Sequence, residues 1–152
     1  MLTFHNPKST SAPNGAYSHG AEVPPNARWL FVAGQIPMRT DGTIPATIEE
    51  QTETVWRNIL AVLADAGMGI ADVVKISSFL TRFDNFARFA QVRAGFLGSH
   101  RPASTSVIVS ALAKPEFLVE VEAIAAKTAA PAKAEARRTP RRSAKPKKRA
   151  RR

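Results

Sequence analysis

The sequence contains no cysteine and only three histidines among its 152 residues. Without cysteine, disulfides, thiolate catalysis and zinc–thiolate sites are excluded, which fits a reducing compartment. The histidines, His5, His19 and His100, are too dispersed in the chain for a metal-ligand motif. We therefore expect no metal site.

The sequence also lacks a long apolar run. No stretch approaches the roughly 18 consecutive apolar residues that a membrane helix requires. The first twenty residues have neither the basic region nor the apolar region of a secretory signal. Hydrophobic residues make up 44% of the chain and charged residues 22%, which is typical of a globular protein. We expect a cytoplasmic protein without a membrane span.

Nearly all of the excess positive charge lies at one end of the chain. Residues 127–152 contain 12 of the 22 Lys and Arg residues and one of the 12 acidic residues, a net charge of 12 − 1 = +11, which leaves 10 − 11 = −1 for residues 1–126. The basic segment has no aromatic or large aliphatic residue, and this composition predicts disorder. We divide the chain into a globular domain, 1–126, and a basic disordered tail, 127–152.

Periodic patterns in residues 1–126 predict alternating strands and helices. Apolar residues at three- and four-residue steps predict a helix over 48–66, after the N-cap Thr47, and a second helix that Asp84 caps and that ends at Leu97. β-branched and aromatic runs predict strands over 28–33, 72–81, 105–110 and 117–126, after a shorter extended segment that Pro24 ends.

This order of elements favours an α+β domain with two helices on one face of a mixed sheet. Two helices cover only one face of such a sheet. The other face then requires a partner, and further copies of the same chain would supply it. We therefore predict a homo-oligomer.

Two carboxylates stand out in the last predicted strand. Glu120 and Glu122 are two residues apart and so share one face of a strand whose other residues are apolar. They are either solvent-facing residues of an edge strand, or partners of an arginine in another subunit, or one of them is a general base. A carboxylate beside Tyr17 at a subunit junction would suit the last role, because partial burial raises its pKa toward the working pH.

Several segments together resemble the RidA family, also called YjgF or the reactive intermediate deaminases. They include Ala16-Tyr17-Ser18, Phe31-Val-Ala-Gly-Gln-Ile-Pro37 and Val119-Glu-Val-Glu-Ala-Ile-Ala125, with further matches at 48–52, 58–63, 72–75, 79–81 and 101–103. The matches are collinear. The resemblance implies a chorismate-mutase-like fold, a homotrimer with three clefts at its subunit interfaces, and hydrolysis of enamines or imines to ammonia and a 2-oxo acid without a metal or cofactor.

The resemblance also assigns site residues. Tyr17 and Glu120 fall on family cleft positions, as catalytic residues, and Gly34 on a strand end that lines the cleft. Active deaminases have Pro-Ala-Arg-Ser where this chain has Pro102-Ala103-Ser104-Thr105, so Ser104 stands where the arginine would bind the substrate carboxylate.

Loss of this arginine would weaken binding of a 2-imino acid by roughly tenfold to a few hundredfold. Arg101, three residues earlier, is a candidate replacement. Otherwise Ser104, Thr105 and Ser106 offer only hydroxyls, and such a lining favours an uncharged or weakly polar ligand.

Two classes of function follow. One is a RidA-like hydrolase of a reactive imine, enamine or related metabolite, in which Glu120 orients water and Tyr17 moves a proton. The other is a noncatalytic trimeric protein that holds a small molecule or acts as a scaffold, while residues 127–152 bind nucleic acid phosphates nonspecifically. The tail alternatively serves only as a solubilising extension.

Overall fold

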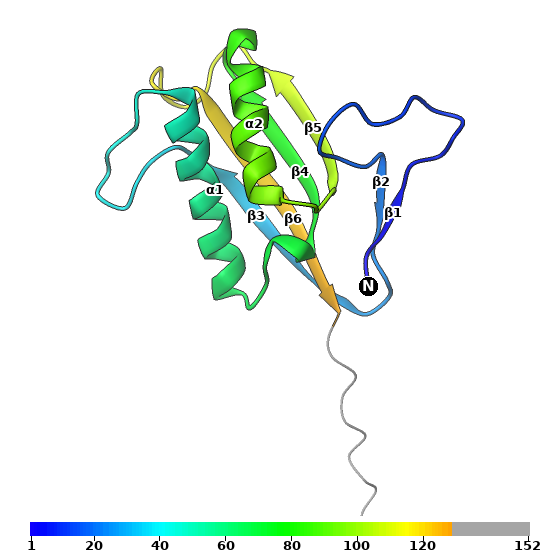
Figure 1. The fold of residues 1–152 in the computed structure, drawn as a ribbon. Coiled ribbons are helices and arrows are strands. Elements are labelled where there is room, and N and C mark those ends of the chain that lie inside the picture. The colour runs from blue at the N-terminus through cyan, green and yellow to red at the C-terminus, as the bar shows by residue number, and fades with distance from the viewer. Residues whose placement is uncertain (129–152) are drawn as a thin grey trace, which may run out of the picture.

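The computed structural model describes residues 1–128 of the chain. These residues form a four-stranded sheet, two α-helices and a separate hairpin (Figure 1). In chain order the elements are β1 (Thr3–His5), β2 (Gly20–Glu22), β3 (Ala27–Gln35), α1 (Ile48–Asp65), β4 (Val73–Leu80), α2 (Phe86–Leu97), β5 (Ala103–Ile108) and β6 (Val119–Thr128), with short 3₁₀ helices at Ile70–Asp72 and Phe83–Asn85.

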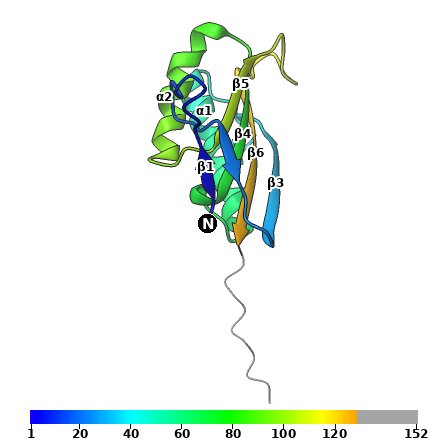
Figure 2. The same ribbon diagram turned by 90° about the vertical axis from the view of Figure 1, so that its right-hand side faces the viewer.

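The main sheet has the strand order β3-β6-β4-β5. β4 runs parallel to β5, whereas β6 runs antiparallel to both of its neighbours, so the sheet is mixed. Both helices lie on one face of the sheet. Figure 2 views the sheet from its edge and shows no helix on the other face. The predicted α+β class and helix placement are confirmed. The prediction did not include β1, which pairs only with β2 in a hairpin outside the main sheet.

The helix α1 begins where the sequence predicts. The Thr47 hydroxyl accepts a hydrogen bond from the backbone N–H of Glu50 at 3.3 Å, which satisfies one free donor of the first turn. Gly67 follows the helix with a φ of 66°, a conformation that glycine adopts without strain. The buried face of α1 includes Val55, Trp56 and Ile59, and it packs on the sheet.

The strand β6 alternates as its sequence predicts, but it lies inside the sheet. Val119, Val121 and Ala123 are buried beneath the helices, while Glu120 and Glu122 point to the opposite face. Pairing with β3 on one side and β4 on the other makes the edge-strand interpretation of the two glutamates wrong. The strand also begins and ends two residues later than predicted and so includes 127–128; residues 129–152 of the predicted tail lie outside the described part of the chain.

The helix-free face of the sheet exposes large apolar side chains. Trp29 is 49% exposed and Phe31 73% exposed, both on β3, and Val107 on β5 is 43% exposed. We call these three residues, with Ile124, the open face. Between residues 1 and 128, no helix is long and apolar enough to cross a membrane.

Candidate functional site

A cleft of about 530 Å³ lies between α2, the beginning of β5 and the loop before β2. Its lining is mostly small or polar, and only one of its residues carries a charge, the arginine Arg93. The lining consists of Asn14, Gly15, Ala16, Tyr17, Phe86, Ala90, Arg93, Ala94, Ser104 and Ser106.

Backbone contacts to β5 hold the loop that carries Tyr17 in place. Ser18 forms a parallel bridge to Ala103, and its N–H donates to the Pro102 carbonyl at 3.0 Å. The side chain of Asn6 accepts from the backbone N–H of His19 at 2.9 Å, which ties the same loop to the hairpin. The structure therefore brings Tyr17 and Ser104, two predicted site residues, to the same cleft.

The cleft also contains Arg93, which we did not predict from the sequence as a site residue. The residue is 6% exposed, and its Nη1 donates to the Ser104 hydroxyl at 3.2 Å and the Ser106 hydroxyl at 3.4 Å. The guanidinium lies over the Phe89 ring, 5.4 Å from the ring centroid. Burial lowers the pKa of Arg93 from its usual value, although a guanidinium remains charged at neutral pH.

The remaining N–H groups of Arg93 have no carboxylate partner among the described residues. Its buried Nε has no hydrogen-bond partner, and within residues 1–128 no carboxylate forms an ion pair with it. A desolvated cation without a counter-ion is unfavourable unless something else compensates for its charge. The cleft lining thus contains one cation in addition to the hydroxyls that the sequence predicts.

The three hydroxyl residues of β5 divide between the two sheet faces. Ser104 and Ser106 face α2, whereas Thr105 faces the open side, where its hydroxyl accepts a 2.6 Å hydrogen bond from Lys75 Nζ. This division follows from the alternation of side chains along a strand. Ser104 and Ser106 therefore belong to the cleft, and Thr105 is not among its lining residues.

The side chain of Arg101 is engaged at the end of α2. Its Nη1 donates to the Gly98 carbonyl at 2.6 Å and to the His100 carbonyl at 2.9 Å. These carbonyls follow the last turn of the helix, where cations bind favourably. Arg101 does not line the cleft in this structure.

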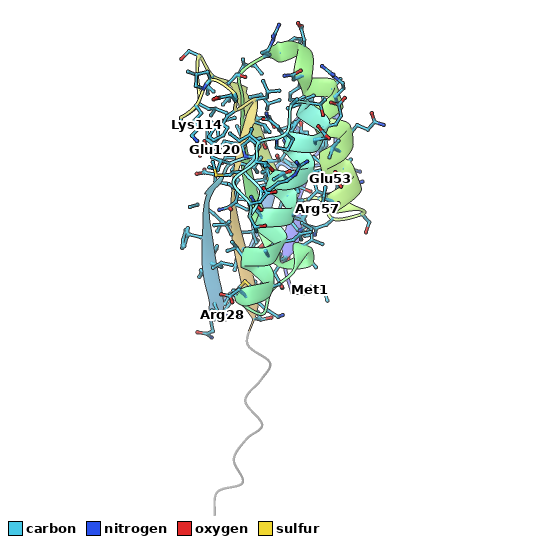
Figure 3. All side chains as sticks on the ribbon, turned by 90° about the vertical axis from the view of Figure 1, so that its left-hand side faces the viewer. Met1, Arg28, Glu53, Arg57, Lys114 and Glu120 are labelled. Carbon is cyan, nitrogen blue, oxygen red and sulfur yellow. The ribbon has the colours of Figure 1, made fainter. Side chains whose placement is uncertain are left out.

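A second group of predicted residues lies on β3 and β6. The register between these strands shifts between Val32 and Gln35, so that β3 carries an extra residue there. Gly34 lies in this irregular segment, and the Glu120 side chain packs directly against it: a Cβ on Gly34 would come within 2.0 Å of Glu120 Oε1. Figure 3 shows Glu120 at the same end of the molecule as Lys114, far from Arg28.

The two groups of residues are separated within one protomer. Glu120 points to the helix-free face, whereas Ser104, which pairs with the fully buried Ile76, points toward the helices. Two strand spacings, about 10 Å, also separate β6 from β5. A single copy of the chain therefore does not bring Glu120 to the cleft that contains Tyr17 and Arg93.

No group of three or more His, Asp or Glu residues with the geometry of a metal site occurs in the described part of the chain. The predicted site residues and Arg93 offer a carboxylate on one face of the sheet, and a phenol, a guanidinium and two hydroxyls in the cleft.

Comparison with known proteins identifies relatives over most of the chain. The family model described as Endoribonuclease L-PSP matches residues 8–127. A RutC family protein of Pyrococcus abyssi is 40% identical over 117 residues, which cover 76% of this chain and 89% of that protein. TdcF of Escherichia coli, whose name describes a reactive intermediate deaminase, is 31% identical over 119 residues, which cover 76% of this chain and 89% of TdcF.

Solved structures agree with these sequence matches. A protein of the Rid family from Yersinia pestis superimposes with a TM-score of 0.73 at 32% identity, over 82% of this chain and 97% of that protein. The structure of Escherichia coli TdcF with bound serine gives a TM-score of 0.64 at 28% identity, over 83% of this chain and 99% of TdcF. On these matches in sequence and structure, the chain belongs to the RidA/YjgF family, whose family model is described as Endoribonuclease L-PSP.

Proposed function

We propose that the protein hydrolyses small reactive imines, and the enamines in equilibrium with them, to ammonia and a carbonyl compound. The observation that carries this proposal is the packing of Glu120 against Gly34, where the missing side chain leaves room for a carboxylate beside the backbone. A carboxylate fixed in this way can orient a water molecule and accept a proton from it. The relation to TdcF, named as a deaminase, supports the same reaction class.

The reaction combines the attack of water with four proton transfers, two as water adds to the imine and two as the adduct collapses. Glu120 accepts a proton as the water oxygen bonds to the imine carbon, while the Tyr17 hydroxyl donates a proton to the imine nitrogen. The adduct then collapses: its hydroxyl returns a proton to Tyr17, Glu120 gives its proton to the nitrogen, and the carbon–nitrogen bond breaks to release ammonia. Atoms and charges balance without a metal or cofactor.

The proposal requires a second copy of the chain. Glu120 and Tyr17 lie on opposite faces and toward different edges of one sheet, so one substrate reaches both only when the β3 edge of one protomer lies against the β5 edge of another. The open face supports association, because Trp29 and Phe31 are large apolar side chains left exposed in a single chain. A ring of three copies would form three such composite clefts.

An assay with short-lived imines tests the function. The purified protein should accelerate ammonia release from 2-iminobutyrate or 2-iminopropionate, generated in the assay by an amino-acid oxidase. Glu120→Gln should lower kcat/KM by roughly a hundredfold or more and Tyr17→Phe by a smaller factor, because each removes a proton-transfer group. Glu122→Gln, on the same strand and face, should retain activity and is the matched control.

No acceleration by the wild-type protein or by a Ser104→Arg variant would reject the hydrolase and favour the alternative, a trimeric protein that binds a small molecule without turnover. Equal loss in Glu120→Gln and Glu122→Gln would remove Glu120 from its proposed role.

A further inference from the structure

We propose that Arg93 of α2 binds the carboxylate of the substrate, so that the cleft selects small anionic imines although β5 offers only Ser104 at the position where the family places an arginine. This inference rests on the proposed site and names its substrate class. It assigns to a helix residue a role that the resemblance to active deaminases assigns to the strand opposite.

The position of Arg93 carries the first part of the argument. The residue lies on the buried stripe of α2 with Phe89 and Leu97, four residues away on either side, so the helix directs it toward β5. There its Nη1 reaches both Ser104 and Ser106. A guanidinium thus lies directly beside the Ser104 side chain, at the end of a longer side chain that comes from the opposite wall.

The charge of Arg93 is the second observation that supports carboxylate binding. It is the one charged residue among those that line the cleft, and none of the other lining residues is a carboxylate. With the residue 6% exposed and its Nε unpaired, the folded chain bears the cost of a buried cation without an internal counter-ion. A leucine or methionine of similar length would fill the same space without that cost, so a purely structural role explains the residue poorly.

The geometry of the Arg93 hydrogen-bond donors is the third observation that supports carboxylate binding. A guanidinium has five N–H groups in one plane, and two serine hydroxyls occupy only Nη1. The hydroxyls fix the orientation of the plane, and within residues 1–128 no acceptor bonds to Nη2 or to the buried Nε. A carboxylate matches that planar arrangement with two parallel hydrogen bonds, whereas a neutral carbonyl accepts fewer and weaker ones.

The inference revises the substrate predicted from the sequence. The serines led us to expect a neutral ligand, but in the structure they support an arginine. We therefore assign to the cleft a 2-imino acid, whose carboxylate faces Arg93 and whose C=N group faces Tyr17 and the Glu120 of a neighbouring copy.

Equilibrium binding of the product analogue 2-oxobutyrate tests the inference without requiring turnover. Titration calorimetry on the full-length protein should detect binding, and Arg93→Met should raise the dissociation constant by roughly tenfold to a few hundredfold through loss of the charged contact. Arg93→Lys keeps a charge but not the planar pair of donors and should fall between the two. Arg88→Gln, which removes a charge from an exposed position of the same helix outside the cleft, is the matched control.

A parallel comparison measures selectivity. Arg93→Met should lower kcat/KM for 2-iminobutyrate much more than for the imine of butanone, which lacks the carboxylate. Equal losses for the two substrates, an unchanged dissociation constant for 2-oxobutyrate, or no binding of 2-oxobutyrate by the wild type would each overturn the inference. If Arg93→Met does not fold, as judged by thermal melting, the titration of Arg93→Lys with 2-oxobutyrate replaces it. A dissociation constant equal to that of the wild type would reject a bidentate contact to Arg93.

The outcomes separate this inference from the proposed function. Binding that depends on Arg93 without any hydrolysis would keep the carboxylate site and reject the hydrolase. If Glu120→Gln lowers the rate of hydrolysis but kcat/KM is the same for charged and neutral imines, the hydrolase proposal stands and the role of Arg93 is rejected.

Discussion

At the scale of single residues, Gly34 limits where the Glu120 carboxylate can lie. In Gly34→Ala the new Cβ would come within 2.0 Å of Glu120 Oε1 and 2.9 Å of Cδ, so the carboxylate must move. The atoms displaced belong to the end of a flexible side chain, so the melting temperature should change little. Activity should fall by about a hundredfold, because a shift of about 1 Å in a catalytic group has that effect.

Gly95→Ala provides the matched comparison. Gly95 is an exposed residue of α2, and a Cβ added there would meet no other atom within 4 Å, so alanine should stabilise the helix by about 0.5–1 kcal/mol and leave activity unchanged. Full activity in Gly34→Ala, measured by ammonia release, would contradict the position assigned to the Glu120 carboxylate.

Among the site residues, some were predicted from the sequence and Arg93 was not. Tyr17, Gly34, Glu120 and Ser104 were assigned by resemblance, and the structure places Tyr17 with Ser104 and Gly34 with Glu120. Arg93 has the spacing of the buried face of α2, so the periodic pattern alone does not separate it from the apolar residues of that stripe. A cation at a position where every neighbour in the stripe is apolar was the available signal, but only the fold shows that this stripe ends opposite the Ser104 hydroxyl.

At the scale of elements, Gln51 connects α1 to the beginning of β6. The residue is 1% exposed; its Nε2 donates to the carbonyls of Pro45 and Glu116 at 2.9 and 2.8 Å, and its Oε1 accepts from the Leu118 N–H at 2.8 Å. Two residues after Leu118 the strand presents Glu120. The helix thus fixes the backbone from which the proposed base projects.

We expect Gln51→Leu to lower the free energy of unfolding by about 3 kcal/mol, because it leaves two carbonyls and one N–H without partners in a sheltered place. Chemical denaturation monitored by circular dichroism measures this loss. Gln91→Leu, on the exposed side of α2, should change stability by less than about 0.5 kcal/mol. A similar small effect in both variants would show that the buried amide does not hold β6.

The elements themselves could be predicted where their periodicity is strong. The apolar steps of α1 and the alternation of β6 gave the right types of structure, and Thr47 marked the N-cap. The predicted start of β6 was two residues early because Phe117 is buried like a strand residue, although it lies before the strand. β1 has only three residues, too few for a periodic signal.

At the scale of the whole molecule, the open face predicts association. Phe31→Glu would place a charge among exposed apolar side chains and one strand away from Glu122, so we expect it to shift the protein from the proposed trimer toward monomers. Size-exclusion chromatography with light scattering measures the change. Phe83→Glu is the matched control, because Phe83 is 75% exposed, close to the 73% of Phe31, but lies on the helix side of the molecule. Loss of association in both variants, or in neither, would contradict assembly through this face.

The charge of the molecule gives the last prediction, which concerns residues 129–152. They carry 11 Lys and Arg residues and one Glu, a net charge of 11 − 1 = +10, so residues 1–128 are formally neutral with 11 basic and 11 acidic residues. Truncation should follow Thr128, because β6 ends there and Lys127 Nζ donates to the Gly67 carbonyl at 2.7 Å. The full-length protein should retain duplex DNA in a filter-binding assay, and the 1–128 protein should not.

Binding by the full chain should weaken steeply as salt rises, because neutralised phosphates release their counter-ions. A full-length variant with residues 129–152 in scrambled order should bind equally well, since contacts to phosphates carry no sequence information. If the full chain and the 1–128 protein bound duplex equally across the salt series, the charge of residues 129–152 would have no part in nucleic acid binding, and the site of that binding would lie in the folded domain.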